Sequence, residues 1–139
     1  MRRAAFRLLP HTADLRVEVR APDFPSLCAR SVEAVFSLLT DRRRVRRVER
    51  RAVSFPPGSP EELLLSVLRR ALLLFSLDRY LVRDADANME GENLVLSVEG
   101  EPSDASRHVV SREIKAVTAH ALTVECGPPG YTARFLLDV

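Results

Sequence analysis

The sequence predicts an α+β fold: a single layered domain over residues 1–139, with a mostly antiparallel sheet of about seven strands and two helices packed on it. Short segments in which apolar and polar residues alternate recur along the chain, and this pattern is typical of half-buried strands. Two longer segments repeat their apolar residues at helical spacing, each after a capping residue. The resulting order, β-β-α-β-α-β-β-β-β, indicates a layered α+β domain.

Three strands and one helix are expected before Pro56. The strand candidates are Phe6 to Leu9, Leu15 to Arg20 and a segment that contains Val53 and Phe55. Asp23 can cap a helix from Phe24 to Leu39, because apolar residues recur at helical spacing over that range. The Pro56-Pro57-Gly58 segment then ends the third strand.

The second helix has a strong local start signal. Ser59 can cap it, Pro60 suits the first helical position, and Glu62 completes a capping box. Its apolar residues form one stripe, which consists of Leu64, Leu65, Leu68, Leu72 and Phe75. A stripe of this length predicts the central core helix of the domain.

Four more strands are expected after this helix. The candidates are Leu81 to Met89, Leu94 to Glu99, the second half of Ile114 to Val124, and a last strand with alternating Tyr131, Ala133, Phe135 and Leu137. Gly100 to Ser106 is predicted to be a polar loop, and Gly127-Pro128-Pro129-Gly130 is predicted to be a turn.

The composition predicts a soluble, cytoplasmic protein without a membrane segment. Hydrophobic residues make up 46% of the 139 residues and charged residues 29%, as in ordinary globular domains. No stretch reaches the roughly 18 to 20 apolar residues that a membrane-spanning helix needs, and no apolar segment of signal-peptide length follows the basic N-terminus. Two cysteines without a Cys-x-x-Cys motif exclude the usual zinc and redox motifs. A net charge of only +2 gives no general argument for nucleic-acid binding.

Two aspartates near opposite ends of the chain are the first candidate site. Asp14 precedes one alternating strand and Asp138 ends another, so an antiparallel sheet can bring their carboxylates together. Like charges that close need a cation, a proton or a basic partner. Oxygen ligands suit Ca²⁺ or Mg²⁺, with Asp41 as a third ligand and the carboxylate of Val139 as another if no residue follows it. Alternatively, each aspartate is a turn or cap residue.

The only lysine and the three histidines are the other candidates. Lys115 stands against twenty arginines, and lysine is a compact charge that can lie beside carboxylates; the alternative is an ordinary surface lysine. His11, His108 and His120 are enough for a zinc site in number, but their spacing gives no support for one. The alternative is that they are polar residues near strand ends.

The segment Arg42 to Arg51 holds seven arginines and is a candidate for phosphate contacts. No aromatic residue is interleaved among them, although proteins usually bind single-stranded nucleic acid with aromatic side chains. A solvated basic edge strand is the alternative, because charge protects sheet edges from pairing with other chains.

Five short motifs are spread over almost the full length of the chain. They are His11-Thr12-Ala13-Asp14, Leu38-Leu39-Thr40-Asp41, Gly100-Glu101 with Asp104 and His108, Ile114-Lys115-Ala116-Val117-Thr118 with His120, and Leu137-Asp138-Val139. In order and spacing, this set resembles the archease family. The specificity lies in the combination, because none of the motifs is decisive alone.

The resemblance implies a small, non-catalytic activator of the RNA-splicing ligase that joins 2′,3′-cyclic-phosphate or 3′-phosphate ends to 5′-hydroxyl ends. Such a protein promotes guanylylation of the ligase's active-site histidine and supports multiple turnover in tRNA splicing or RNA repair. The family's metal site implies Asp14 and Asp138 as ligands, with Asp41 and Val139 as neighbours. Its functional lysine corresponds to Lys115. The remaining expected partner-activating residues are the motif histidines, His11 and His120.

The resemblance also implies a divalent cation, Ca²⁺ or Mg²⁺, as cofactor, and RNA contact only through the ligase. A chaperone-like role toward a tRNA methyltransferase belongs to the same expectation, as does a monomer in isolation. Two alternatives stay open: an RNA-binding module that uses Arg42 to Arg51, and a metal-dependent phosphoesterase built on the same carboxylates. The second lacks an obvious general base or phosphate-binding glycine loop.

Overall fold

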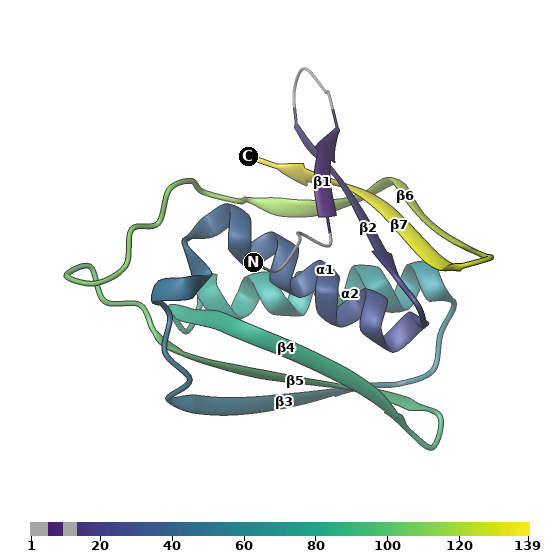
Figure 1. The fold of residues 1–139 in the computed structure, drawn as a ribbon, viewed down its shortest axis with the longest axis horizontal. Helices are drawn as coiled ribbons and strands as arrows, with labels where there is room; N and C mark the ends of the chain where they lie inside the picture. Colours follow the sequence, from purple (N-terminus) through teal and green to yellow (C-terminus); the bar gives the residue numbers. More distant parts are fainter. Residues whose placement is uncertain (1–5, 10–13) are drawn as a thin grey trace.

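The seven strands of the described chain form two separate antiparallel sheets, and both α-helices lie between them (Figure 1). The computed structural model describes residues 6–9 and 14–139. The order of strands and helices agrees with the prediction, with one short 3-10 helix, η1 (Arg42–Arg44), added after the first α-helix. The α+β class is therefore confirmed, whereas the expected single sheet is divided into two.

The four-stranded sheet joins the two ends of the described chain. It contains β1 (Phe6–Leu9), β2 (Leu15–Ala21), β6 (Ala116–Gly127) and β7 (Gly130–Asp138), in the order β1-β2-β7-β6. β2 and β7 pair so that Leu15 lies opposite Leu137, and β6 and β7 pair so that Ala116 lies opposite Asp138. β6 is an edge strand and begins earlier than the sequence pattern predicts.

The three-stranded sheet is built from the middle of the chain. It contains β3 (Glu49–Phe55), β4 (Tyr80–Glu90) and β5 (Asn93–Pro102), in the order β3-β5-β4. The predicted basic edge strand is confirmed only for the end of the segment: β3 lies at the edge and includes Arg50 and Arg51, whereas Arg42–Arg44 form η1. The prediction of a loop from Gly100 is wrong for its first three residues, which continue β5 and pair with β4.

Both α-helices begin where the capping signals predict. Asp23 caps α1 (Phe24–Leu39) by accepting a 2.9 Å hydrogen bond from the backbone N–H of Ser26. Ser59 and Glu62 form the predicted capping box of α2 (Pro60–Ser76), with both hydrogen bonds at 3.2 Å. Among the described residues, no helix combines the length and apolar character that crossing a membrane requires.

The central core helix is α1, not α2 as the apolar stripe predicts. Eleven of the sixteen residues of α1 are buried, compared with six of the seventeen residues of α2. Both helices contact strands of both sheets, α1 through β2 and β4 and α2 through β6 and β4, but α2 leaves Leu73 exposed to solvent. Cys28 lies on α1 in the middle of the core, and burial raises the pKa of its thiol to about 12. It is therefore a core residue.

Candidate functional site

Asp14 and Asp138 lie at the same end of two paired strands. Asp14 directly precedes Leu15, and Asp138 directly follows Leu137, the residue opposite Leu15. The register therefore places the backbones of Asp14 and Asp138 at neighbouring positions. Whether the two carboxylates share one ion stays a prediction.

Lys115 lies next to Asp138, directly before β6, the third strand of the row. Its backbone N–H donates a 2.7 Å hydrogen bond to the carbonyl oxygen of Asp138, and the next residue, Ala116, is the register partner of Asp138. Lys115 is exposed. The ends of three adjacent strands, β2, β7 and β6, thus place Asp14, Asp138 and Lys115 at one end of the four-stranded sheet. We call these three residues the tip.

The alternation along β7 determines how the tip is presented. Leu137 and its partner on β6, Val117, are buried in the core between the sheets. Because successive side chains in a strand point to opposite faces, Asp138 lies on the face directed away from the helices, and it is exposed. A carboxylate in this position is accessible to a cation or a partner molecule.

Asp41 has a different role in the described structure. Its side chain caps η1 and accepts hydrogen bonds from the backbone N–H of Arg43 at 3.1 Å and from the Arg43 guanidinium at 3.0 Å on each oxygen. These hydrogen bonds lower the pKa of the Asp41 carboxyl. Both oxygens thus already have a cationic partner, which agrees with the alternative interpretation of Asp41 as a cap residue.

Residues 6–9 and 14–139 contain no group of three or more His, Cys, Asp or Glu side chains that could hold a metal ion. Asp14, Asp138 and Asp41 are therefore not gathered as three ligands. The pair Asp14 and Asp138 stays the predicted donor set for a hard cation, which prefers oxygen ligands. Val139 is exposed next to Asp138, and its role as a ligand stays a prediction.

The histidines do not form one cluster in the described residues. His108 is buried: its Nδ1 accepts a 2.9 Å hydrogen bond from the backbone N–H of Asp104, and its Nε2 lies 2.9 Å from Glu101 Oε2. Both ring nitrogens are thus used inside the loop, so His108 is not available to bind zinc. His11 lies outside the described residues.

His120 lies in an irregular part of the edge strand β6. The register between β6 and β7 shifts between Thr118 and Thr123, and Ala121 has a positive φ of 60°. His120 is exposed there, and its backbone N–H bonds the Thr118 hydroxyl at 3.1 Å. A bulge of this kind redirects side chains and disrupts edge pairing. The apolar pattern of the sequence contains no signal for it.

Glu101 is a buried carboxylate with basic partners, and in the sequence it stood out only as part of a motif. Glu101 bonds the Arg107 guanidinium, the backbone N–H of Arg46 at 2.7 Å and His108. Burial by itself raises the pKa of the Glu101 carboxyl, but these hydrogen bonds outweigh it and lower the pKa to about 2. Glu101 therefore holds the loop after β5 against the loop after η1.

The arginine-rich segment Arg42 to Arg51 is largely paired within the protein. Four of its seven arginines lie within 4 Å of carboxylates; these pairs are Arg42 with Glu33 and Asp84, Arg43 with Asp41, Arg47 with Asp84, and Arg51 with Glu49 and Asp78. The pairing leaves fewer guanidinium groups for phosphate. The RNA-binding alternative therefore receives little support from this segment.

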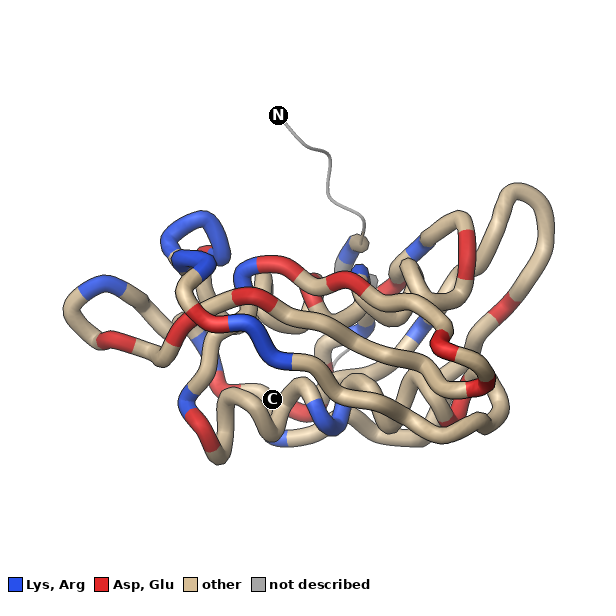
Figure 2. The backbone as a smooth tube through the Cα atoms, turned by 90° about the horizontal axis from the view of Figure 1, so that it is seen from below, with Lys and Arg blue, Asp and Glu red and all other residues tan. Residues whose placement is uncertain are grey.

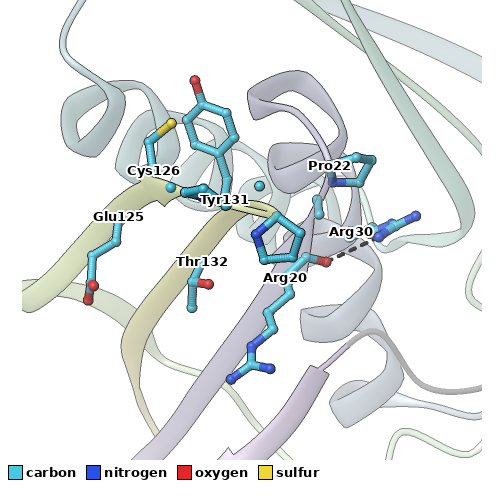
Figure 3. A pocket seen from close by; sticks show the side chains of 12 residues that line it. Arg20, Pro22, Arg30, Glu125, Cys126, Tyr131 and Thr132 are labelled. Carbon is cyan, nitrogen blue, oxygen red and sulfur yellow. Dashed lines mark hydrogen bonds between the residues drawn. The ribbon is translucent and has the colours of Figure 1, made fainter.

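A shallow pocket of about 390 Å³ lies at the opposite end of β7 from the tip (Figure 3). It is lined by the β6–β7 turn together with Arg20, Arg30 and Tyr131, and Arg30 donates a 3.1 Å hydrogen bond to the carbonyl oxygen of Arg20. A hydrogen bond with Cys126 is the main cause that raises the pKa of Tyr131. None of the candidate site residues named from the sequence lines this pocket.

Known proteins resemble this chain over nearly its full length. Residues 6–139 match the Archease protein family (MTH1598/TM1083). Protein archease from Methanopyrus kandleri is 30% identical over 135 residues, which cover 94% of this chain and 96% of that protein. Protein archease from Thermococcus gammatolerans is 30% identical over 138 residues, which cover 93% of this chain and 94% of that protein.

The fold is also found in a solved structure. The solution structure of Methanobacterium thermoautotrophicum protein 1598 covers 99% of this chain and 100% of its own, with a TM-score of 0.78 and 24% sequence identity. At this identity the likeness shows the shared α+β fold alone.

Proposed function

Because this chain belongs to the archease family, we propose that it is a non-catalytic protein cofactor that activates an RNA-splicing ligase in the cytoplasm. In this proposal it promotes guanylylation of the ligase and supports multiple turnover during tRNA splicing or RNA repair. The ligase provides the nucleophile and contacts the RNA.

One observation carries the proposal: three strands bring together the residues that the family resemblance marks as functional. The β2–β7 register places Asp14 next to Asp138, and the backbone of Lys115 is bonded to Asp138. These residues come from distant parts of the sequence, and Asp138 and Lys115 are exposed. Their arrangement supports a role in contacting a partner.

The donor set suits a divalent cation, Ca²⁺ or Mg²⁺, held by Asp14 and Asp138. When bound, the cation supplies a local positive charge that offsets the repulsion between the two carboxylates. The chain itself orients the two carboxylates through the strand register and places the Lys115 backbone beside them. Activation then consists of positioning and electrostatic support for guanylyl transfer in the ligase.

The alternatives have less support. An RNA-binding module needs available cations, and four arginines of the basic segment already have carboxylate partners. A phosphoesterase needs an assembled set of ligands, and the described residues contain no group of three. A role toward a tRNA methyltransferase has no specific observation in its favour.

The test is ligase guanylylation at limiting concentrations of this protein. Asp14→Ala and Asp138→Ala should each remove the stimulation while the fold stays intact, because neither residue belongs to the apolar core. Asp86→Ala is the matched control, because Asp86 is an exposed aspartate on β4 of the other sheet. A folded Asp138→Ala protein that stimulates at the wild-type rate would contradict the proposal.

Cation binding can be measured without the ligase. Calcium or magnesium ions should raise the thermal unfolding temperature of the wild-type protein, because a ligand that binds only the folded state stabilises it. The increase should disappear in Asp138→Ala and remain in Asp86→Ala. An equal increase in all three proteins would place the bound cation elsewhere.

A further inference from the structure

The loop between β5 and β6, residues 103–115, is held firmly against the end of the helical layer. Its backbone bonds the last turn of α1, with Ser111 N–H to the Leu39 carbonyl at 2.8 Å and Thr40 Oγ1 to the Val109 carbonyl at 2.8 Å. Its far end is tied to β7 through the bond from Lys115 to Asp138. The loop therefore has a defined conformation next to the tip.

The outer side of this loop is apolar where a loop is normally polar. Val109 has 75% of its surface exposed, the largest fraction among the large apolar side chains of the described residues, and Val110 has 37%. The backbone of the loop faces inward to its partners while these two side chains face solvent. Apolar groups presented on an ordered loop are typical of interaction sites, and little conformational freedom is lost when such a loop binds.

Three cations lie on this loop or on η1, which is bonded to it: Arg112 and Lys115 follow Val110 in the loop, and Arg44 belongs to η1. Arg44, Arg112 and Lys115 are exposed, and none of the three lies within 4 Å of a carboxylate in the part of the chain that the structure describes. Arg44 is bonded to the carbonyl oxygen of Arg107 at 3.3 Å, which attaches η1 to the loop. Figure 2 shows lysine and arginine segments at this end of the molecule, with aspartate and glutamate segments among them. Glu113 is the only acidic residue between Val109 and Lys115.

This combination favours a protein partner over RNA. The loop contains no Phe, Tyr or Trp, although stacking on aromatic side chains is the usual means of binding single-stranded nucleic acid. Valines instead suit the apolar centre of a protein interface, with charged groups around it. The charge of the surrounding groups calls for acidic residues on the partner.

We infer that Arg44, Val109, Val110 and Arg112 form a docking surface for the ligase, and that it receives a patch with an apolar centre and an acidic rim. The inference rests on the proposed function and assigns the binding step to residues outside the acidic pair. The docking surface borders the tip at Lys115, so a ligase bound there is held next to Asp14 and Asp138. The docking surface sets affinity, whereas the tip sets the extent of activation.

The experiment is a titration of the ligase with this protein, read as guanylylation rate. Val109→Asp and Arg112→Glu should each raise the half-saturating concentration by roughly tenfold and leave the maximal stimulation unchanged. Arg112→Lys keeps the charge and should stay near wild type. Met89→Asp is the matched control, because Met89 is 46% exposed at the distant β4–β5 hairpin. Added salt should raise the half-saturating concentration of the wild type.

The outcomes separate this inference from the proposed function. If the wild-type protein does not stimulate the ligase, both the proposed function and the docking surface are wrong. If the wild type stimulates but Val109→Asp and Arg112→Glu behave like Met89→Asp, only the docking surface is wrong. If the two variants keep the wild-type half-saturating concentration but lose affinity for a single-stranded RNA without ligase, the surface contacts nucleic acid and the inference is overturned.

Discussion

The two sheets of this protein differ in how far apart their paired strands lie along the sequence. The three-stranded sheet uses β3, β4 and β5, which follow one another with only α2 between them. The four-stranded sheet pairs β2 with β7, which come from opposite ends of the described sequence. The candidate site lies on the four-stranded sheet, so Asp14 and Asp138 are brought together only by a long-range pairing that is costly to close before the rest of the chain folds.

Each sheet contains one glycine that packs directly against the backbone of a neighbouring segment. Substitution of these glycines tests how closely the backbones are packed in each sheet. A Cβ on Gly100 would lie 1.8 Å from the Leu81 carbonyl oxygen, and a Cβ on Gly130 would lie 2.5 Å from the Ala21 carbonyl oxygen. Gly100→Ala should therefore lower the free energy of unfolding by about 4 kcal/mol, and Gly130→Ala by about 2 kcal/mol. Denaturant unfolding measures both.

Gly127→Ala is the control for this series, because no atom lies within 4 Å of a Cβ at that position. Its effect should stay within about 0.5 kcal/mol. If Gly100→Ala is as stable as Gly127→Ala, the close contact between β4 and β5 is absent in solution, and the three-stranded sheet is looser than described.

Both sheets also bury a glutamate among arginines. Glu101 at the end of β5 bonds Arg107 and His108. Glu18 on β2 bonds Arg7 and Arg134, and both of these bonds to Glu18 are 2.9 Å long. Glu101→Gln should lower the free energy of unfolding by about 2 kcal/mol, because the amide keeps the shape but loses the charge-assisted bonds. Asp84→Asn, at a more exposed carboxylate paired with Arg47, should cost less than half as much.

The pH dependence of stability follows from the same carboxylate. The pKa of Glu101 is about 2 in the folded protein against 4.5 for the free side chain, so the folded state favours the ionised form. This contribution is fully present above about pH 4.5 and is lost as the pH falls toward 2. The stability difference between the wild type and Glu101→Gln should shrink over that window; a constant difference would contradict the lowered pKa.

Substitution of Lys115 has the smallest expected effect on stability. It therefore tests the function of the four-stranded sheet without disturbing its fold. Lys115→Ala should change the free energy of unfolding by no more than about 0.5 kcal/mol, because the side chain is exposed and the backbone bond to Asp138 remains. It should nevertheless lower the ligase stimulation. Lys115→Arg should keep part of the stimulation if only the charge matters. Wild-type guanylylation by Lys115→Ala would show that Lys115 is a surface residue without a role.

Local signals in the sequence were enough for most of the elements. Asp23, Ser59 and Glu62 cap helices where predicted, since a cap depends on residues only two or three positions apart. Alternation likewise predicted the last strand and its buried face. The end of β5 was missed because Gly100 to Pro102 pair with β4 through backbone groups alone, and a backbone pairing leaves no apolar pattern.

The sequence by itself determined the elements, their order, and the candidate residues Asp14, Asp138 and Lys115, because these depend on residue type and short spacing. Only the tertiary structure decided that the strands divide into two sheets, that Asp41 is paired with Arg43, and that Val109 faces solvent on the loop after β5. Each of these features depends on which residues come into contact, either from distant parts of the chain or in competition for the same group. Such choices are made by the packing of the whole core, which no local pattern of residues records.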